Sequence, residues 1–174
     1  HSFSVVNTSF STPVYAMAFG DGNTRKDDYG TIQYAETDDK ITVRFRAWHL
    51  NPALANSTGA DIYFAVADSS NAFADAGTVS RTTFPDFDIN RGDLRLVFNG
   101  YVTNQGDTSG AVATSTATKF TPYWEVSKEI IPREDYFDDG DKDFEIKLYT
   151  SSADRNALED TYEGDALEFN LKDD

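Results

Sequence analysis

The stretch Ile41-Thr-Val-Arg-Phe-Arg-Ala-Trp48 decides the fold class of this chain. In an extended conformation, one side of the stretch carries Ile41, Val43, Phe45 and Ala47, and the other side carries Thr42, Arg44, Arg46 and Trp48. A period of two is typical of a β-strand with one buried face. We therefore expect a sheet whose inner surface packs on a hydrophobic core.

Similar strand-like segments lie on both sides of this stretch, and the turns between them are rich in Gly, Asp, Asn and Ser, which favour tight turns. Only residues 70–76 and 154–161 have a helical pattern, and both segments are short. Many short strands without a long helix predict an all-β fold, a single β-sandwich of jelly-roll or Greek-key type over residues 1–174. The other expected strands are residues 14–19, 32–34, 62–67, 79–84, 94–102, 120–126, 144–150 and 166–171.

The composition fits one folded domain and excludes several classes of function. Of the 174 residues, 39% are hydrophobic and 14% aromatic, which is enough to build a core. The 30 acidic and 15 basic residues give a net charge of −15, so we expect no nucleic-acid partner, because phosphate binding needs clustered Lys and Arg. No apolar run approaches the roughly 20 residues of a membrane span.

The absence of cysteine excludes disulfides, thiolate zinc sites and thiol catalysis. No Gly-X-Ser-X-Gly motif frames a nucleophilic serine, so an enzyme is the less favoured class. The chain begins with His1 and has no signal peptide, so we expect a mature secreted or cell-surface protein whose leader has been removed. Asn7 and Asn56 lie in Asn-X-Ser/Thr sequons, the acceptors of N-glycosylation.

Residues 1–12 form a separate strand-like segment, set off from residues 14–19 by Pro13. Phe3 and Val5 lie on one side of the extended segment, and Val6 and Phe10 lie on the other. The segment is either the first strand of its own sandwich or a donor strand that completes the sheet of another copy. The residues favour neither alternative.

Two histidines suggest a copper site. The amino group and imidazole of His1, with the imidazole of His49, would supply three nitrogens, a set that suits Cu(II). This set resembles the histidine brace of lytic polysaccharide monooxygenases, which are secreted β-sandwiches that begin with His. The resemblance covers only these two residues and the fold class, and it implies an oxidase or a copper carrier.

Two acidic loops suggest calcium. Asp86, Asp88 and Asn90 place oxygen ligands at alternating positions, as a calcium loop requires. The loop departs from the EF-hand pattern, because Gly92 falls one place late and Val97 stands where a glutamate ligand is needed. A second loop carries Asp138, Asp139 and Asp141. Solvated acidic turns are the alternative for both.

The C-terminal segment Glu159-Asp-Thr-Tyr-Glu-Gly-Asp-Ala-Leu-Glu-Phe-Asn-Leu171 is a turn that ends at Gly164 and continues into a final strand. It resembles the closing segment of the TasA/camelysin family, in which an Asn-X-Tyr-Gln-Gly-Asn-like turn precedes the last strand. The matching positions are Asp160, Tyr162, Glu163, Gly164 and Asp165. The early Pro-Gly-Asp turn of that family is absent, and Asn51-Pro52 stands nearest to it.

The resemblance implies a secreted jelly roll that polymerises into extracellular fibres or pili, each N-terminal strand completing the sheet of a neighbour. The leading hypothesis is thus a structural subunit of an extracellular filament or surface matrix, a head-to-tail homopolymer assembled by donor-strand complementation through residues 1–12. It requires no cofactor. The alternatives are the copper protein and a carbohydrate-binding module with Trp48, Trp124 or Tyr149 on its surface.

Overall fold

The structure is a computed structural model. It describes residues 13–19, 32–36, 40–50, 59–102, 121–134 and 140–173 of the chain. The predicted donor residues Phe3, Val5, Val6 and Phe10 lie outside the described residues, as do His1, Asp138, Asp139 and the sequon asparagines Asn7 and Asn56.

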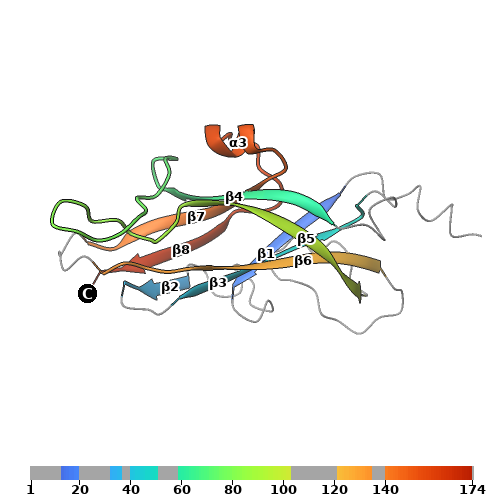
Figure 1. The fold of residues 1–174 in the computed structure, drawn as a ribbon, viewed down its shortest axis with the longest axis horizontal. Helices are drawn as coiled ribbons and strands as arrows, with labels where there is room; N and C mark the ends of the chain where they lie inside the picture. Colours follow the sequence, from blue (N-terminus) through green and yellow to red (C-terminus); the bar gives the residue numbers. More distant parts are fainter. Residues whose placement is uncertain are drawn as a thin grey trace, which may run out of the picture.

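The chain is all-β, with a single short helix among the described residues (Figure 1). No described helix has the length and apolar character that crossing a membrane would require. The elements are β1 (Val14–Phe19), β2 (Ile32–Ala35), β3 (Ile41–Trp48), β4 (Ala60–Asp68), β5 (Arg91–Val102), β6 (Thr121–Ile130), β7 (Lys142–Tyr149), α3 (Ser152–Ala157) and β8 (Leu167–Lys172).

The strands follow the order β1-β3-β6-β5-β4-β7-β8-β2 and form a sandwich of two layers. Strand β5 belongs to both layers, because its first half pairs with β4 and its second half with β6. We call β1, β3, β6 and the end of β5 the β3 layer, and the start of β5 with β4, β7, β8 and β2 the β7 layer. Strands β4, β5 and β6 are paired consecutively, and β3, which a longer connection joins to β4, lies on the other side of β6. The order β3-β6-β5-β4 is therefore a Greek key. The predicted sandwich is therefore confirmed.

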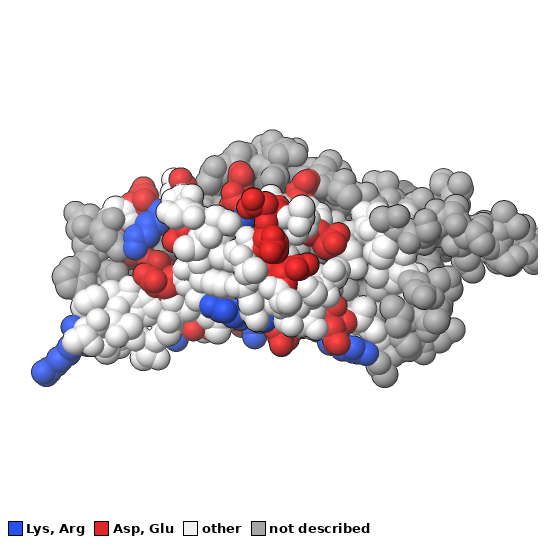
Figure 2. All heavy atoms as spheres, turned by 90° about the horizontal axis from the view of Figure 1, so that it is seen from above, with Lys and Arg blue, Asp and Glu red and all other residues white. Residues whose placement is uncertain are grey.

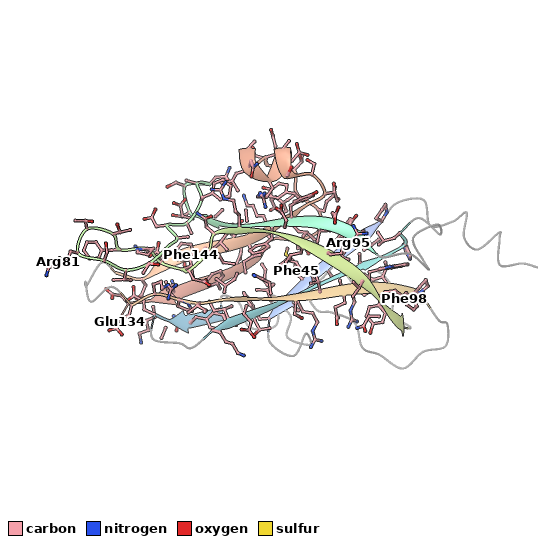
Figure 3. The ribbon with its side chains drawn as sticks, in the orientation of Figure 1. Phe45, Arg81, Arg95, Phe98, Glu134 and Phe144 are labelled. Carbon is pink, nitrogen blue, oxygen red and sulfur yellow. The ribbon has the colours of Figure 1, made fainter. Side chains whose placement is uncertain are left out.

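Aromatic side chains fill the space between the layers, as Phe45 and Phe144 illustrate in Figure 3. Phe45 of the β3 layer packs against Phe64 of the β7 layer with ring centroids 5.7 Å apart. Phe87 enters the core from the loop between β4 and β5, 4.8 Å from the ring of Phe144. The predicted inner residues of β3 (Ile41, Val43, Phe45, Ala47) are fully buried, as the period of two requires.

Residues 69–90 correct two predictions, because the expected helix 70–76 and the expected strand 79–84 do not form. The carboxylate of Asp68 accepts hydrogen bonds from Ser70 N (2.8 Å) and Ala72 N (3.0 Å), which fixes a turn. The hydroxyl of Ser80 accepts from Thr82 N and Thr83 N in the same way. Such side chains compete with helix and sheet hydrogen bonds for the backbone, so a long ordered loop results.

The turn before β8 lies against β1 at the open side of the sandwich. Gly164 has a φ of +73°, and a Cβ atom built on it would lie 2.9 Å from the carbonyl oxygen of Tyr15. The close approach and the left-handed backbone both require glycine. Gly164, a residue of the predicted C-terminal turn, therefore allows the turn before β8 to lie against β1.

We expect Gly164→Ala to lower the free energy of unfolding by more than Gly140→Ala. Both glycines have positive φ, and at Gly140 a Cβ atom would meet nothing within 4 Å. Gly140→Ala should lose about 1–2 kcal/mol from the backbone conformation alone, and Gly164→Ala should lose more, because Tyr15 must also shift. Urea denaturation measures both, and equal losses would show that the Tyr15 contact contributes nothing.

Candidate functional sites

Strand β1 is an edge strand without the features that usually protect an edge. Its sequence, Val-Tyr-Ala-Met-Ala-Phe, contains no charge and no proline. Among the described residues it pairs only with β3, and none of the backbone hydrogen bonds outside the strand ladders involves it. Residues 15–19 are nevertheless only 0–9% exposed. The outward N–H and C=O groups of β1 are thus buried and have no described partner.

The opposite edge of the sheet is different. Strand β2 has four residues and pairs in parallel with β8. Gln33 in its middle is exposed and polar. Because protected edges are usually short and polar, β1 has the composition of the less protected edge, although residues 15–19 are covered.

His49 follows the last residue of β3, as predicted, and its backbone is left-handed with a φ of 60°. Burial lowers the pKa of His49, so its imidazole is neutral at pH 7 and able to bind a metal. Its predicted partner His1 lies outside the described residues. The copper site therefore stays a prediction.

In the first predicted calcium loop, the candidate ligands Asp86, Asp88 and Asn90 form hydrogen bonds or ion pairs with other residues of the protein. Asp86 is 5% exposed and forms an ion pair with Lys142 at 3.0 Å. The carboxylate of Asp88 accepts from Ile131 N at 2.8 Å, and the amide of Asn90 donates to Ala74 O at 2.7 Å. These bonds hold the loop between β4 and β5 against the end of β6.

In the second loop, Asp141 and Asp173 join the start of β7 to the end of β8. The carboxylate of Asp141 accepts from Asp173 N, and that of Asp173 accepts from Gly140 N, both at 2.9 Å. Within the described ranges, no three acidic or histidine side chains are grouped so that they could hold a metal ion. Calcium binding by either loop stays a prediction.

An acidic cavity of about 330 Å³ lies on the β7 layer. Asp68, Asp143, Glu145 and Glu168 line it together with Ser69, Phe144 and Phe169. Glu145 and Glu168 are directly opposite each other on β7 and β8, an arrangement of like charges that destabilises a sheet. Figure 2 shows that acidic side chains are also grouped elsewhere on the face that carries α3. The sequence pattern did not predict this cavity, although the alternation in β7 places Asp143 and Glu145 on one face.

The outer face of the β3 layer carries a buried ion pair between Arg46 and Glu125. Arg46 is 3% exposed, and its Nε and Nη2 donate to the same carboxylate oxygen of Glu125, at 2.9 and 2.7 Å. The guanidinium also lies over the ring of Tyr123, 4.1 Å from its centroid. The period of two predicted that Arg46 faces outward, but it did not predict that this face is covered.

The aromatic residues expected to bind carbohydrate are not on the surface. Trp48 and Trp124 are 0% and 1% exposed, and Tyr149 is 1% exposed. The hydroxyl of Tyr149 donates to Glu159 O at 2.9 Å, and burial raises the pKa of Tyr149 to about 12. Because a sugar platform needs an exposed ring, the expectation for these three residues is wrong.

Comparisons with known proteins identify no family. No protein-family model and no curated protein matches the chain. The chain is similar to the crystal structure of the apo form of the Calx CBD1 domain, with 16% identity, a TM-score of 0.43, and coverage of 92% of this chain and 98% of that chain. It is also similar to the calcium binding domain CBD12 of CALX1.1, with 18% identity and a TM-score of 0.40. The latter match covers 91% of this chain and 44% of that chain.

We expect Glu125→Gln to lower the free energy of unfolding by about 2–3 kcal/mol, because it leaves the buried guanidinium of Arg46 without its charged partner. The matched control is Glu129→Gln. Glu129 pairs with Lys40 at 3.1 Å, but both side chains are more than half exposed, so less than about 1 kcal/mol should be lost. Thermal and urea denaturation measure both variants. Similar losses would show that burial does not distinguish the two pairs.

Proposed function

We propose that this chain is a structural subunit of a secreted, extracellular filament, which assembles when residues 1–12 of one copy pair with β1 of the next. The observation that carries the proposal is the edge of β1, which is apolar and buried and which, within the part of the chain that the structure describes, pairs only with β3. A buried backbone group without a partner costs about 1–3 kcal/mol. An added strand would remove that cost along the whole edge.

Residues 1–12 have the composition of such a strand. Phe3, Val5, Val6 and Phe10 supply apolar side chains on both sides, and each could contribute roughly 1.5–3 kcal/mol when buried. Each backbone hydrogen bond would add about 1 kcal/mol. The turn before β8 lies beside β1, because Gly164 contacts Tyr15. This turn resembles that of the TasA/camelysin family at Asp160, Tyr162, Glu163, Gly164 and Asp165.

The geometry of strand donation leads to a filament. The donor segment and the acceptor edge are different surfaces of one molecule, so the contact between copies is heterologous and does not close on itself. Each added copy brings a new β1 edge and a new donor segment. The net charge of −15 would disfavour lateral association of the copies at low ionic strength.

A chain lacking residues 1–12 should fold and remain monomeric, whereas the full chain should form fibres. Light scattering and electron microscopy at equal protein concentration measure this difference. A matched control, Phe3→Asp with Val5→Asp in the full chain, keeps the length but adds charge where apolar contacts are needed, and it should also be monomeric.

Two outcomes would contradict the proposal. A truncated chain that still forms fibres would show that assembly uses another surface. A full chain that stays monomeric, with a truncated form that is much less stable, would show that residues 1–12 are the first strand of their own sandwich.

The second candidate, a copper protein of the histidine-brace type, is favoured by one observation: His49 is neutral and has a strained left-handed backbone at the end of β3. We expect Cu(II) to give a three-nitrogen electron paramagnetic resonance signal that is lost in both His1→Ala and His49→Ala. A signal unchanged in His49→Ala, or no such signal in the full chain, would discard this candidate.

A further inference from the structure

Lys147 is a buried lysine that contacts a side-chain amide. It lies on the outer face of β7, is 7% exposed, and its Nζ is 2.6 Å from Oδ1 of Asn71. None of the ion pairs formed among the described residues includes Lys147. An amine that is removed from water would usually be paired with a carboxylate, so its contact with a carboxamide needs an explanation.

The amide of Asn71 is held in place by the turn after β4. Asn71 has a left-handed backbone with a φ of 56°, and hydrogen bonds from Ser70 N and Ala72 N to Asp68 fix the residues on either side. Its Nδ2 donates to Leu158 O at 3.2 Å. The amide nitrogen therefore faces the segment after α3, while its carbonyl faces the lysine amine.

The surroundings of the pair exclude water on one side. Nζ of Lys147 lies 5.1 Å from the ring centroid of Tyr162, and Tyr162 packs against Tyr149 and Leu158. Glu145 is two residues before Lys147 on the same face of β7. The two side chains therefore project from the same side of the strand as neighbours; burial and then the negative charge of Glu145 raise the pKa of Tyr162. An amine, an amide and a carboxylate are thus gathered at one place.

We propose that Lys147 and Asn71 become joined by an intramolecular isopeptide bond. In its neutral form, Nζ of Lys147 attacks Cγ of Asn71 with its lone pair, the Nζ–Cγ bond forms, and the Cγ–Nδ2 bond breaks. Glu145 accepts a proton from the attacking nitrogen and returns it to Nδ2, which leaves as ammonia. The step needs no oxidant, reductant or cofactor, and the exposed position of Asn71 gives the ammonia a path to solvent.

The bond would act as a covalent brace in a chain without cysteine. It would connect positions separated by 76 residues, tying the loop after β4 to β7. Closing a long loop restricts the unfolded chain most. This inference does not depend on the filament proposal, because both partners belong to one copy.

Intact-mass spectrometry of the full chain tests the proposal directly. We expect a mass lower by one ammonia than the sequence requires, and a branched proteolytic fragment that contains both Lys147 and Asn71. Lys147→Arg and Asn71→Ala should each show no loss of ammonia. Asn71→Asp should lose water instead and reach the same final mass as the linked parent.

Further variants separate the bond from other reactions of Asn71. Cyclisation of Asn71 to a succinimide would also release ammonia, but it would persist in Lys147→Arg. Lys172→Arg, at the exposed end of β8, is the matched control and should keep the full loss of ammonia. Glu145→Gln should slow the loss. A full chain that retains its unmodified mass after days at neutral pH would overturn the proposal, and so would a loss that survives in Lys147→Arg.

Discussion

The rest of this molecule depends on one constraint, namely that every buried backbone group of a sheet needs a hydrogen-bond partner. In the described sheet the strands meet it through continuous ladders from β1 to β2. Strand β5 continues from one layer into the other and so joins the two layers at one side. At the opposite side the layers end in β1 and β2, and there Gly164 brings the turn before β8 against β1; among the described residues this turn forms no backbone hydrogen bond with β1. The proposed filament follows from this local deficit.

The outer faces of the two layers handle charge in different ways. On the β3 layer, Glu125 pairs with Arg46 at 2.7 Å and lies 4.0 Å from Arg44, so charges of opposite sign are brought together there. On the β7 layer, Glu145 is directly opposite Glu168, and Lys147, two residues after Glu145, contacts Asn71. The repulsion between Glu145 and Glu168 destabilises this face of the sheet. The same arrangement places the Glu145 carboxylate, a proton acceptor, on the face of β7 that carries Lys147.

Sequence periodicity predicted the regular parts of the fold because strands with one buried face follow a simple rule. The predicted bounds of β1 and β3 are confirmed, and the expected helix at 154–161 is found at Ser152–Ala157. The rule failed at residues 70–76 and 79–84. There the side chains of Asp68 and Ser80 accept hydrogen bonds from backbone N–H groups, and these turns form in place of the expected helix and strand. The rule also could not predict that Trp48, on the polar side of β3, is buried. Burial of the outer face of a strand depends on residues that are distant from it in sequence.

The candidate sites were harder to predict than the fold because they depend on pairs of strands. The acidic cavity arises only when β7 and β8 align Glu145 with Glu168, and the Lys147–Asn71 contact joins a strand to a distant turn. Spacing along the chain selected Asp86, Asp88 and Asn90 instead, whose side chains turn out to fasten the loop after β4.

Amide hydrogen exchange of residues 14–19 tests the central claim about β1 most directly, with assembled full-length protein compared with the chain lacking residues 1–12. The account predicts that alternate amides of β1, those that do not bond to β3, exchange rapidly in the truncated chain and become protected in the assembly. Equal exchange of these amides in the two samples would contradict it.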